Sequence, residues 1–263
     1  MQPRSSEFTL IGTHHANLRF PAGASKLQPS AFVIAVFEFV LLIFSLSVHE
    51  CAHAWMASRL GDQTARLQGR VTLNPMYHVD PIGTLLFPAI IIFGPLFGMS
   101  MFGGMLIGWA KPTPVISRNF RKIIRDENLV TLAGPVSNLL LVLAAFSVLA
   151  VIALAVPGGH DIVLATFAGG LSLGVPSGLQ ALVLLCTLAI LINISLFFFN
   201  LLPIPPLDGS HIVRNMLPYN AVQVYDRVPI WASYLLMIFV GGSVLRMLIG
   251  PSLRLVYSAL FHL

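Results

Sequence analysis

The fold of this chain is decided by one stretch, Leu46-Ser47-Val48-His49-Glu50-Cys51-Ala52-His53. It lies inside an apolar run, from Ala31 to about Met56, in which the only other charge is Glu38. On a helix, His49 and His53 are one turn apart and project from the same face. Ionisable side chains in hydrocarbon are costly and are kept there for a function. The stretch therefore predicts a membrane helix that carries a functional site.

This spacing of histidines is also that of a metal site. Two such imidazoles can hold one zinc ion, with Glu50 beside them as general base for a water molecule. A catalytic zinc site needs a third protein ligand, for which Asp208 and His211 are the distal candidates. Three prolines closely precede Asp208, and irregular backbone at membrane depth is tolerated where it lines a polar cavity. By spacing alone, Asp208 could equally cap the helix that follows.

The composition excludes an ordinary soluble domain. Of 263 residues, 56% are hydrophobic and only 10% are charged, whereas soluble domains carry about 25% charge. The 15 Lys and Arg outnumber the 10 Asp and Glu, but they fall mostly in short loops between apolar runs. That pattern is typical of membrane topology and does not indicate nucleic-acid binding. The composition therefore predicts an all-α polytopic protein of the lipid bilayer.

Apolar segments divide the chain. Four are long enough to be transmembrane helices, at about 31–58, 129–156, 179–202 and 230–249. They define an N-terminal tail (1–30), a core (31–215) and a last transmembrane helix with a C-terminal tail (216–263). Residues 67–73 alternate apolar and polar side chains, which predicts a short β-element near the active site.

A fifth apolar segment, 82–108, is broken by prolines and glycines, so a continuous helix is not expected there. His49 and Asp208 lie near the C-terminal ends of their spans, so to share a metal these two spans must run in the same direction. Residues 129–156 supply the one crossing needed between them, and two more would need about 40 residues. The segment is therefore predicted to be a re-entrant hairpin bent near Gly94-Pro95. Ten of the 15 Lys and Arg then share one side, which should be cytoplasmic.

Five motifs carry a more specific signal. They are His49-Glu50-x-x-His53, Arg70-Val71-Thr72-Leu73-Asn74-Pro75-x-x-His78-x-Asp80-Pro81, Gly108-Trp109-Ala110-Lys111-Pro112, Ala133-Gly134-Pro135-x-x-Asn138 and Asn200-x-x-Pro203-x-x-x-x-Asp208-Gly209. Together they resemble the site-2 protease family of intramembrane zinc metalloproteases, in its compact bacterial branch, over about residues 31–215. A departure is Ser210, where relatives usually carry a second Gly.

The resemblance implies a multi-pass enzyme of the bacterial inner membrane that cleaves transmembrane protein substrates. His49, His53 and Asp208 would bind Zn²⁺, and Glu50 would be the general base. Asn138 and Asn200 are assigned supporting catalytic roles at the oxyanion, although either could instead form an interhelical hydrogen bond. His78 is a weaker candidate, with a capped turn as its alternative.

Two rival functions fit parts of the sequence. A divalent-cation transporter or channel would also bury His, Glu and Asp, but it predicts polar positions repeated along several helices. A non-catalytic homologue that binds membrane proteins is the second, and the intact Glu50 argues against it.

Overall fold

The fold is a bundle of helices. The computed structural model describes residues 29–99, 110–167, 177–237, 239 and 242–263. The α-helices are α1 (Pro29–Leu60), α2 (Thr64–Leu67), α3 (Phe87–Phe93), α4 (Ile123–Ala155), α5 (Gly159–Phe167), α6 (Ser177–Asn200), α7 (Asp208–Met216), α8 (Tyr219–Tyr225), α9 (Ile230–Leu236) and α10 (Gly242–Phe261). Of these, α1, α4, α6 and α10 are long and apolar enough to cross a membrane. The predicted all-α, polytopic class is confirmed, and these described ranges contain no β-strand.

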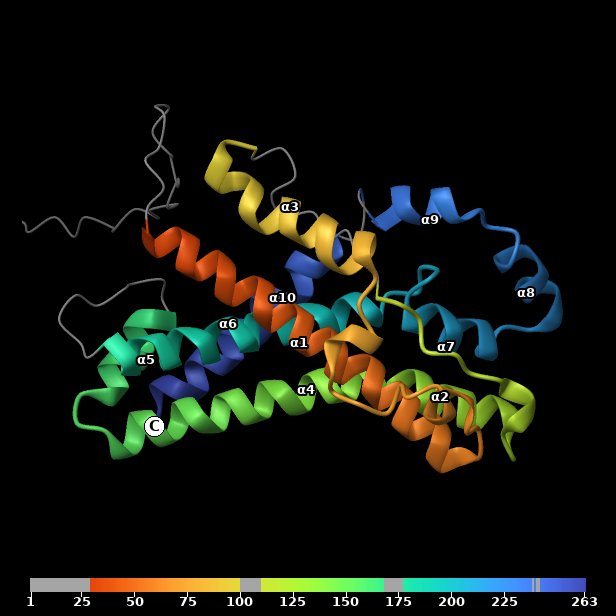
Figure 1. Cartoon of the computed structure of the whole chain (residues 1–263), viewed down its shortest axis with the longest axis horizontal. Coiled ribbons are helices and arrows are strands. Elements are labelled where there is room, and N and C mark those ends of the chain that lie inside the picture. Colours follow the sequence, from red (N-terminus) through yellow and green to blue (C-terminus); the bar gives the residue numbers. More distant parts are fainter. Residues whose placement is uncertain (1–28, 100–109, 168–176, 238, 240–241) are drawn as a thin grey trace, which may run out of the picture.

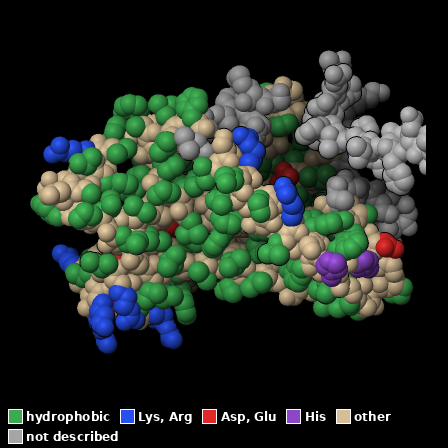
Figure 2. All heavy atoms as spheres, turned by 180° about the vertical axis from the view of Figure 1, so that it is seen from behind, with side chains coloured by type: hydrophobic (Ala, Val, Ile, Leu, Met, Phe, Trp, Pro, Cys, Tyr) green, Lys and Arg blue, Asp and Glu red, His purple; other side chains and the backbone are tan. Residues whose placement is uncertain are grey.

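The long helices form the frame of the site. In Figure 1, α1 and α6 run in the same direction, and α4 runs antiparallel to both. Helix α4 packs against α1 and α6, and Asn193 on α6 donates a hydrogen bond to Ser45 Oγ on α1, at 3.0 Å. Polar side chains of this kind hold membrane helices together. Figure 2 shows a largely apolar face whose Lys and Arg gather toward the end that holds α7 and α8 in Figure 1.

The main apolar core lies at the opposite end of the bundle. It is built from α4, α5, α6 and α10, with Leu149, Val163, Ile190 and Leu260 fully buried at its centre. The charged and polar residues of the candidate site are therefore separated from the best-packed part of the protein.

The first three spans were predicted correctly, with ends that differ by a few residues, but the fourth was misplaced. The span predicted at 230–249 is divided: α9 ends as an α-helix at Leu236, and the spanning helix α10 begins at Gly242. Helix α10 also contains a proline, Pro251, in its interior. Membrane helices tolerate such a proline because neighbouring groups satisfy the freed backbone carbonyl.

The strand predicted at 67–73 is wrong. Leu67 ends α2, and the residues after it lie in turns and bends. A half-buried strand would bury its apolar side chains and expose its polar ones. The structure has the reverse, because Arg70 is only 6% exposed while Leu67 is 85% exposed. Gly69 has a φ of +74°, which ends the extended geometry that a strand needs. The buried Arg70 guanidinium donates to the carbonyl oxygens of Tyr77 and Lys111, so it fixes a loop and not a sheet.

The segment after this loop runs along α1. It consists of a π-helical turn (Pro81–Leu86), α3 and a 3₁₀ turn (Gly94–Phe97). Phe93 packs its ring against Phe39 and Phe32, with centroids 5.7 and 6.1 Å away. The chain turns at Gly98, which has a φ of +78°. Residues 100–108 of the predicted hairpin, and 1–28 of the predicted tail, lie outside the described residues.

Candidate metal centre

Helix α1 brings the two histidines together. His49 and His53 are 3% and 7% exposed. Their Nε2 atoms are 3.0 Å apart, with the rings nearly perpendicular. One helical turn separates them, as the sequence predicts.

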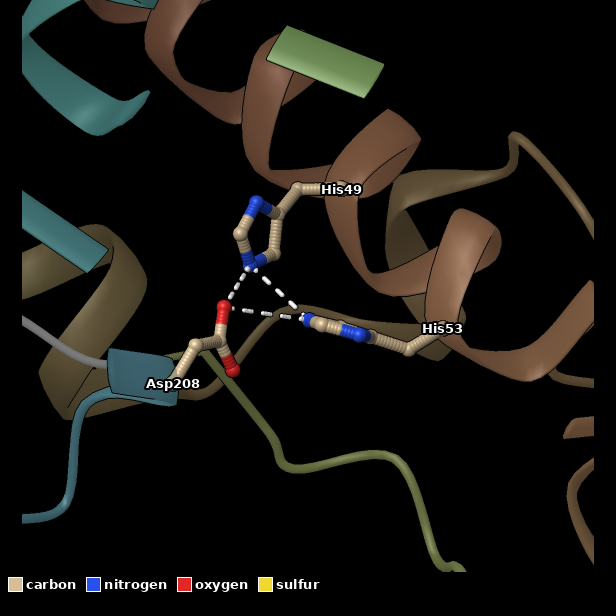
Figure 3. A group of neighbouring side chains, drawn as sticks. All are labelled: His49, His53 and Asp208. Atoms are coloured by element: carbon tan, nitrogen blue, oxygen red, sulfur yellow. Dashed lines mark hydrogen bonds and ion pairs between the residues drawn. The ribbon is translucent and has the colours of Figure 1, made fainter. Parts of the chain in front are cut away.

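Asp208 completes the cluster from the other side (Figure 3). Its Oδ2 atom is 3.1 Å from His49 Nε2 and 3.4 Å from His53 Nε2. Asp208 is the first residue of α7. The N-cap residue of this helix is Leu207, and no side chain forms a capping hydrogen bond there. The carboxylate points at the histidines (Figure 3), so the capping alternative is not what the structure has. His211, the other distal candidate, is exposed and lies outside the cluster.

Gly209 makes the position of Asp208 sterically feasible. A Cβ atom at residue 209 would lie 2.2 Å from the carbonyl oxygen of Leu201, so the chain folds back too closely for any side chain. The 203–207 loop between them contains a cis peptide bond, Pro205-Pro206. The Asp-Gly pair thus places the carboxylate at the end of a tight return from α6.

One face of α4 supports both imidazoles. Three positions spaced by four residues, Val130, Gly134 and Asn138, follow one another along it. The carbonyl oxygen of Val130 accepts from His53 Nδ1 at 2.7 Å, and Asn138 Oδ1 accepts from His49 Nδ1 at 2.9 Å. Between them, a Cβ atom at Gly134 would lie 2.3 Å from His53 Nε2 and 2.6 Å from His49 Nε2. Such outer hydrogen bonds orient metal-binding histidines and set their tautomer.

These contacts determine what the cluster can bind. A carbonyl oxygen only accepts, so Nδ1 carries the proton of the neutral His53 ring and Nε2 presents a lone pair. His49, bonded to Asn138 Oδ1, is in the same state. With both rings neutral, two Nε2 lone pairs and a carboxylate oxygen converge, and the buried Asp208 Oδ2 lies 3.1 and 3.4 Å from the two Nε2 atoms. Three converging acceptors repel one another unless a cation lies between them.

The spacing fits zinc. Zinc–ligand bonds of 2.0–2.1 Å at tetrahedral angles place neighbouring ligand atoms about 3.3 Å apart. The observed separations of 3.0, 3.1 and 3.4 Å are close to this value. Within the described part of the chain, His49, His53 and Asp208 are the only group of three or more His, Cys, Asp or Glu residues whose ligand atoms lie this close together.

Glu50 lies beside the cluster and is held by another segment. Its Oε2 accepts from the Thr113 hydroxyl at 2.8 Å and from the Thr113 backbone N–H at 3.2 Å. Thr113 belongs to residues 110–116, which have no regular secondary structure. This contact was not foreseen, because nothing in the sequence relates a threonine between two prolines to a glutamate 63 residues earlier.

The two predicted asparagines differ in placement. Asn138 contacts the site through His49, and its buried Nδ2 has no partner among the described residues. Asn200, at the end of α6, instead donates to the Leu196 carbonyl oxygen in its own helix, at 2.9 Å. His78 is buried, and its Nε2 bonds to the Thr72 carbonyl oxygen at 2.8 Å, away from the cluster.

Two histidines and a carboxylate are a ligand set of catalytic zinc sites, and ionisable residues buried among membrane helices mark functional sites. The chain belongs to Peptidase family M50, whose sequence profile matches residues 37–241. The resemblance to the site-2 proteases is thereby confirmed.

The names of individual relatives agree with this family assignment. "Putative zinc metalloprotease YwhC" of Bacillus subtilis (strain 168) is 40% identical over 179 residues, which cover 68% of this chain and 68% of that protein. "Putative zinc metalloprotease Rip2" of Mycolicibacterium smegmatis is 32% identical over 190 residues, or 71% of this chain and 60% of that protein. Rip2 of Mycobacterium tuberculosis (strain H37Rv) is 32% identical over 188 residues, or 70% and 58%. No solved structure matches the chain.

Proposed function

We propose that this protein is a zinc metalloendopeptidase that hydrolyses peptide bonds within or near the transmembrane helices of other membrane proteins. His49, His53 and Asp208 are its metal ligands and Glu50 is its general base. The observation that carries the proposal is the convergence of three buried acceptor atoms within 3.4 Å of one another. Family membership supports the protease activity.

A zinc ion held there would polarise the scissile carbonyl and lower the pKa of the attacking water. The protein residues perform the remaining steps. The carboxylate of Glu50 accepts the proton of the water and passes it to the leaving amide nitrogen. The ring nitrogens of His49 and His53 keep their orientation through Asn138 and the Val130 carbonyl group.

We assign donors for the oxyanion to the two asparagines. Asn138 Nδ2 is buried next to His49 and has no hydrogen-bond partner among the described residues, so both of its hydrogens are available. Asn200 Nδ2 has one hydrogen bonded to Leu196, which leaves the second for a substrate oxygen. Donors of this type stabilise the negative charge that develops in the transition state.

The proposed topology has a re-entrant hairpin at 82–108. The N–H of Lys111 donates to the carbonyl oxygen of His78 at 2.9 Å, so the chain on both sides of the segment lies together. The Phe93 ring meanwhile lies beside Phe32 and Phe39, near the other end of α1. A segment that extends along α1 and returns is supported by both contacts. The gathering of basic side chains at the α7 end supports a cytoplasmic site in a bacterial inner membrane.

The decisive experiment uses Glu50→Gln in the full chain, reconstituted with single-span substrates. Gln has the same shape and keeps an oxygen that can accept from Thr113, so only the base is lost. Zinc content should stay at the wild-type level while cleavage is abolished, and a chelator should abolish cleavage by the wild type. Proteolysis by the Glu50→Gln variant at the wild-type rate would disprove the assignment.

A further inference from the structure

Thr113 lies in an unusual backbone setting. It stands between Pro112 and Pro114, so its N–H is the only backbone donor of these three residues. A residue before proline is also restricted to extended conformations. The direction of the Thr113 N–H is therefore restricted by the covalent chain before any tertiary contact forms, and that N–H points at Glu50 Oε2.

Buried groups hold this segment at both ends. On one side, Lys111 is bonded through its N–H to His78 and through its carbonyl oxygen to the Arg70 guanidinium. On the other, the N–H of Ile116 donates to Asp62 Oδ2 at 2.7 Å. Arg70 is 6% exposed and its guanidinium donates to carbonyl oxygens, and Asp62 is fully buried. Burying charges is costly, so the geometry they fix is expected to have a use.

The contact with Glu50 is made by two donors on one oxygen. Both the hydroxyl and the N–H of Thr113 reach Oε2, and the hydroxyl also lies 3.2 Å from the Glu50 backbone oxygen. No donor is bonded to Oε1 among the described residues. A carboxylate fixed through one oxygen has a defined orientation and one oxygen left to act.

We propose that Thr113 is a positioning residue for the general base: it holds Oε2 of Glu50 so that Oε1 is the atom that takes the proton from water. The Arg70–His78 loop and Asp62 act through it, because they place the segment that carries Thr113. This inference rests on the proposed function, since it assigns Glu50 as the base. It also gives the Arg70–Pro81 motif a use that the metal ligands alone do not explain.

The kinetic test compares two substitutions at residue 113. Thr113→Val has the same shape and keeps the N–H but loses the hydroxyl, whereas Thr113→Ser keeps both donors. Loss of one hydrogen bond to a charged group predicts that Thr113→Val lowers kcat about ten- to a hundredfold. KM and zinc content should stay within about twofold of the wild type, and Thr113→Ser should restore most of the rate.

Ser117→Ala is the matched control. Its hydroxyl donates to Glu127 at 2.9 Å, so this variant also removes a hydroxyl–carboxylate bond, four residues further on and outside the site. It should leave kcat within about twofold of the wild type. If Thr113→Val lowers the rate no more than Ser117→Ala, or if it loses zinc, Thr113 does not position the base.

A second measurement does not depend on activity. Glu50→Cys and Thr113→Cys are combined in a background in which the two free cysteines, Cys51 and Cys186, are replaced by alanine. Mild oxidation with iodine in membranes should form a disulfide, seen as protection of both thiols from a maleimide–polyethylene glycol label. The single-cysteine variants should label fully. A double variant that labels fully refutes the contact, whereas a wild type without chelator-sensitive proteolysis refutes the proposed function and leaves the disulfide result to decide the contact.

Discussion

Gly134→Ala, which adds a single methyl group to α4, should damage the proposed metal site. The new Cβ atom would lie 2.3 Å from His53 Nε2, about 1.1 Å short of the 3.4 Å at which van der Waals contact becomes ordinary. It would also lie 2.6 Å from both Cε1 and Nε2 of His49. Neither imidazole can move away freely, because Val130 and Asn138 hold the Nδ1 atoms.

The displacement can be compared with what a metal tolerates. Zinc sites keep their ligand distances within about 0.2 Å, so a shift of about 1 Å at one or both histidines exceeds this tolerance about fivefold. Loss of an outer hydrogen bond alone lowers metal affinity about 10- to 100-fold. Because Gly134→Ala moves the ligands themselves, we expect at least a 100-fold loss. Overpacking between α1 and α4 should also destabilise the fold by about 1–3 kcal/mol.

The assay is zinc content by elemental analysis, with a chelator titration of the detergent-purified protein. Gly250→Ala is the control: it lies inside the spanning helix α10, and a Cβ atom there would meet nothing within 4 Å. That variant should bind zinc like the wild type. Full zinc with unchanged resistance to the chelator in Gly134→Ala would refute the close packing of α4 on the histidines.

Three further predictions follow from other parts of the structure. Asp208→Ala should lose zinc while His211→Ala keeps it, because only Asp208 reaches the histidines; elemental analysis of both proteins decides this. Burial raises the pKa of Asp62, but donors from Thr64, Ile116 and Asn119 outweigh it and hold that pKa below its usual value near 3.8. The ionised form therefore stabilises the fold above about pH 4 and this stabilisation is lost as the pH falls further, so the melting temperature of Asp62→Asn should depend less on pH between 3 and 5. Finally, Arg66→Cys and Arg121→Cys in a cysteine-free background should label from the same side of the membrane; labelling from opposite sides would exclude the re-entrant hairpin.

The sequence was sufficient for features that depend on local pattern. Hydrophobic length identified α1, α4 and α6, because a membrane span needs about 20 apolar residues whatever its partners are. The spacing of His49 and His53 fixed their common face, because it depends only on helix geometry. The same reasoning misplaced the last span, since an apolar window does not reveal that one helix ends at Leu236 and another begins at Gly242.

The error at residues 67–73 has a different physical cause. Alternating apolar and polar side chains predict a strand only if the apolar ones are buried. Here the buried side chain is Arg70, because two carbonyl oxygens, of Tyr77 and Lys111, are available to its guanidinium. Leu67 and Leu73 are exposed instead. Backbone acceptors carry no sequence signal, so this reversal could not be predicted from residue types.

The same limit explains which parts of the site were missed. Side chains that touch the histidines directly, Asp208 and Asn138, stand in recognisable motifs. The Val130 carbonyl group does not, although its bond to His53 Nδ1 leaves Nε2 as the nitrogen that faces His49 and Asp208. Helix α1 uses different side chains toward different neighbours: His49 and His53 meet α4 and α7, while Glu50, together with Asp62 just beyond the end of the helix, holds the 113–119 segment. One helix thus carries both proposed histidine ligands and the proposed base, and a shift of either neighbour should alter one of them without displacing the other.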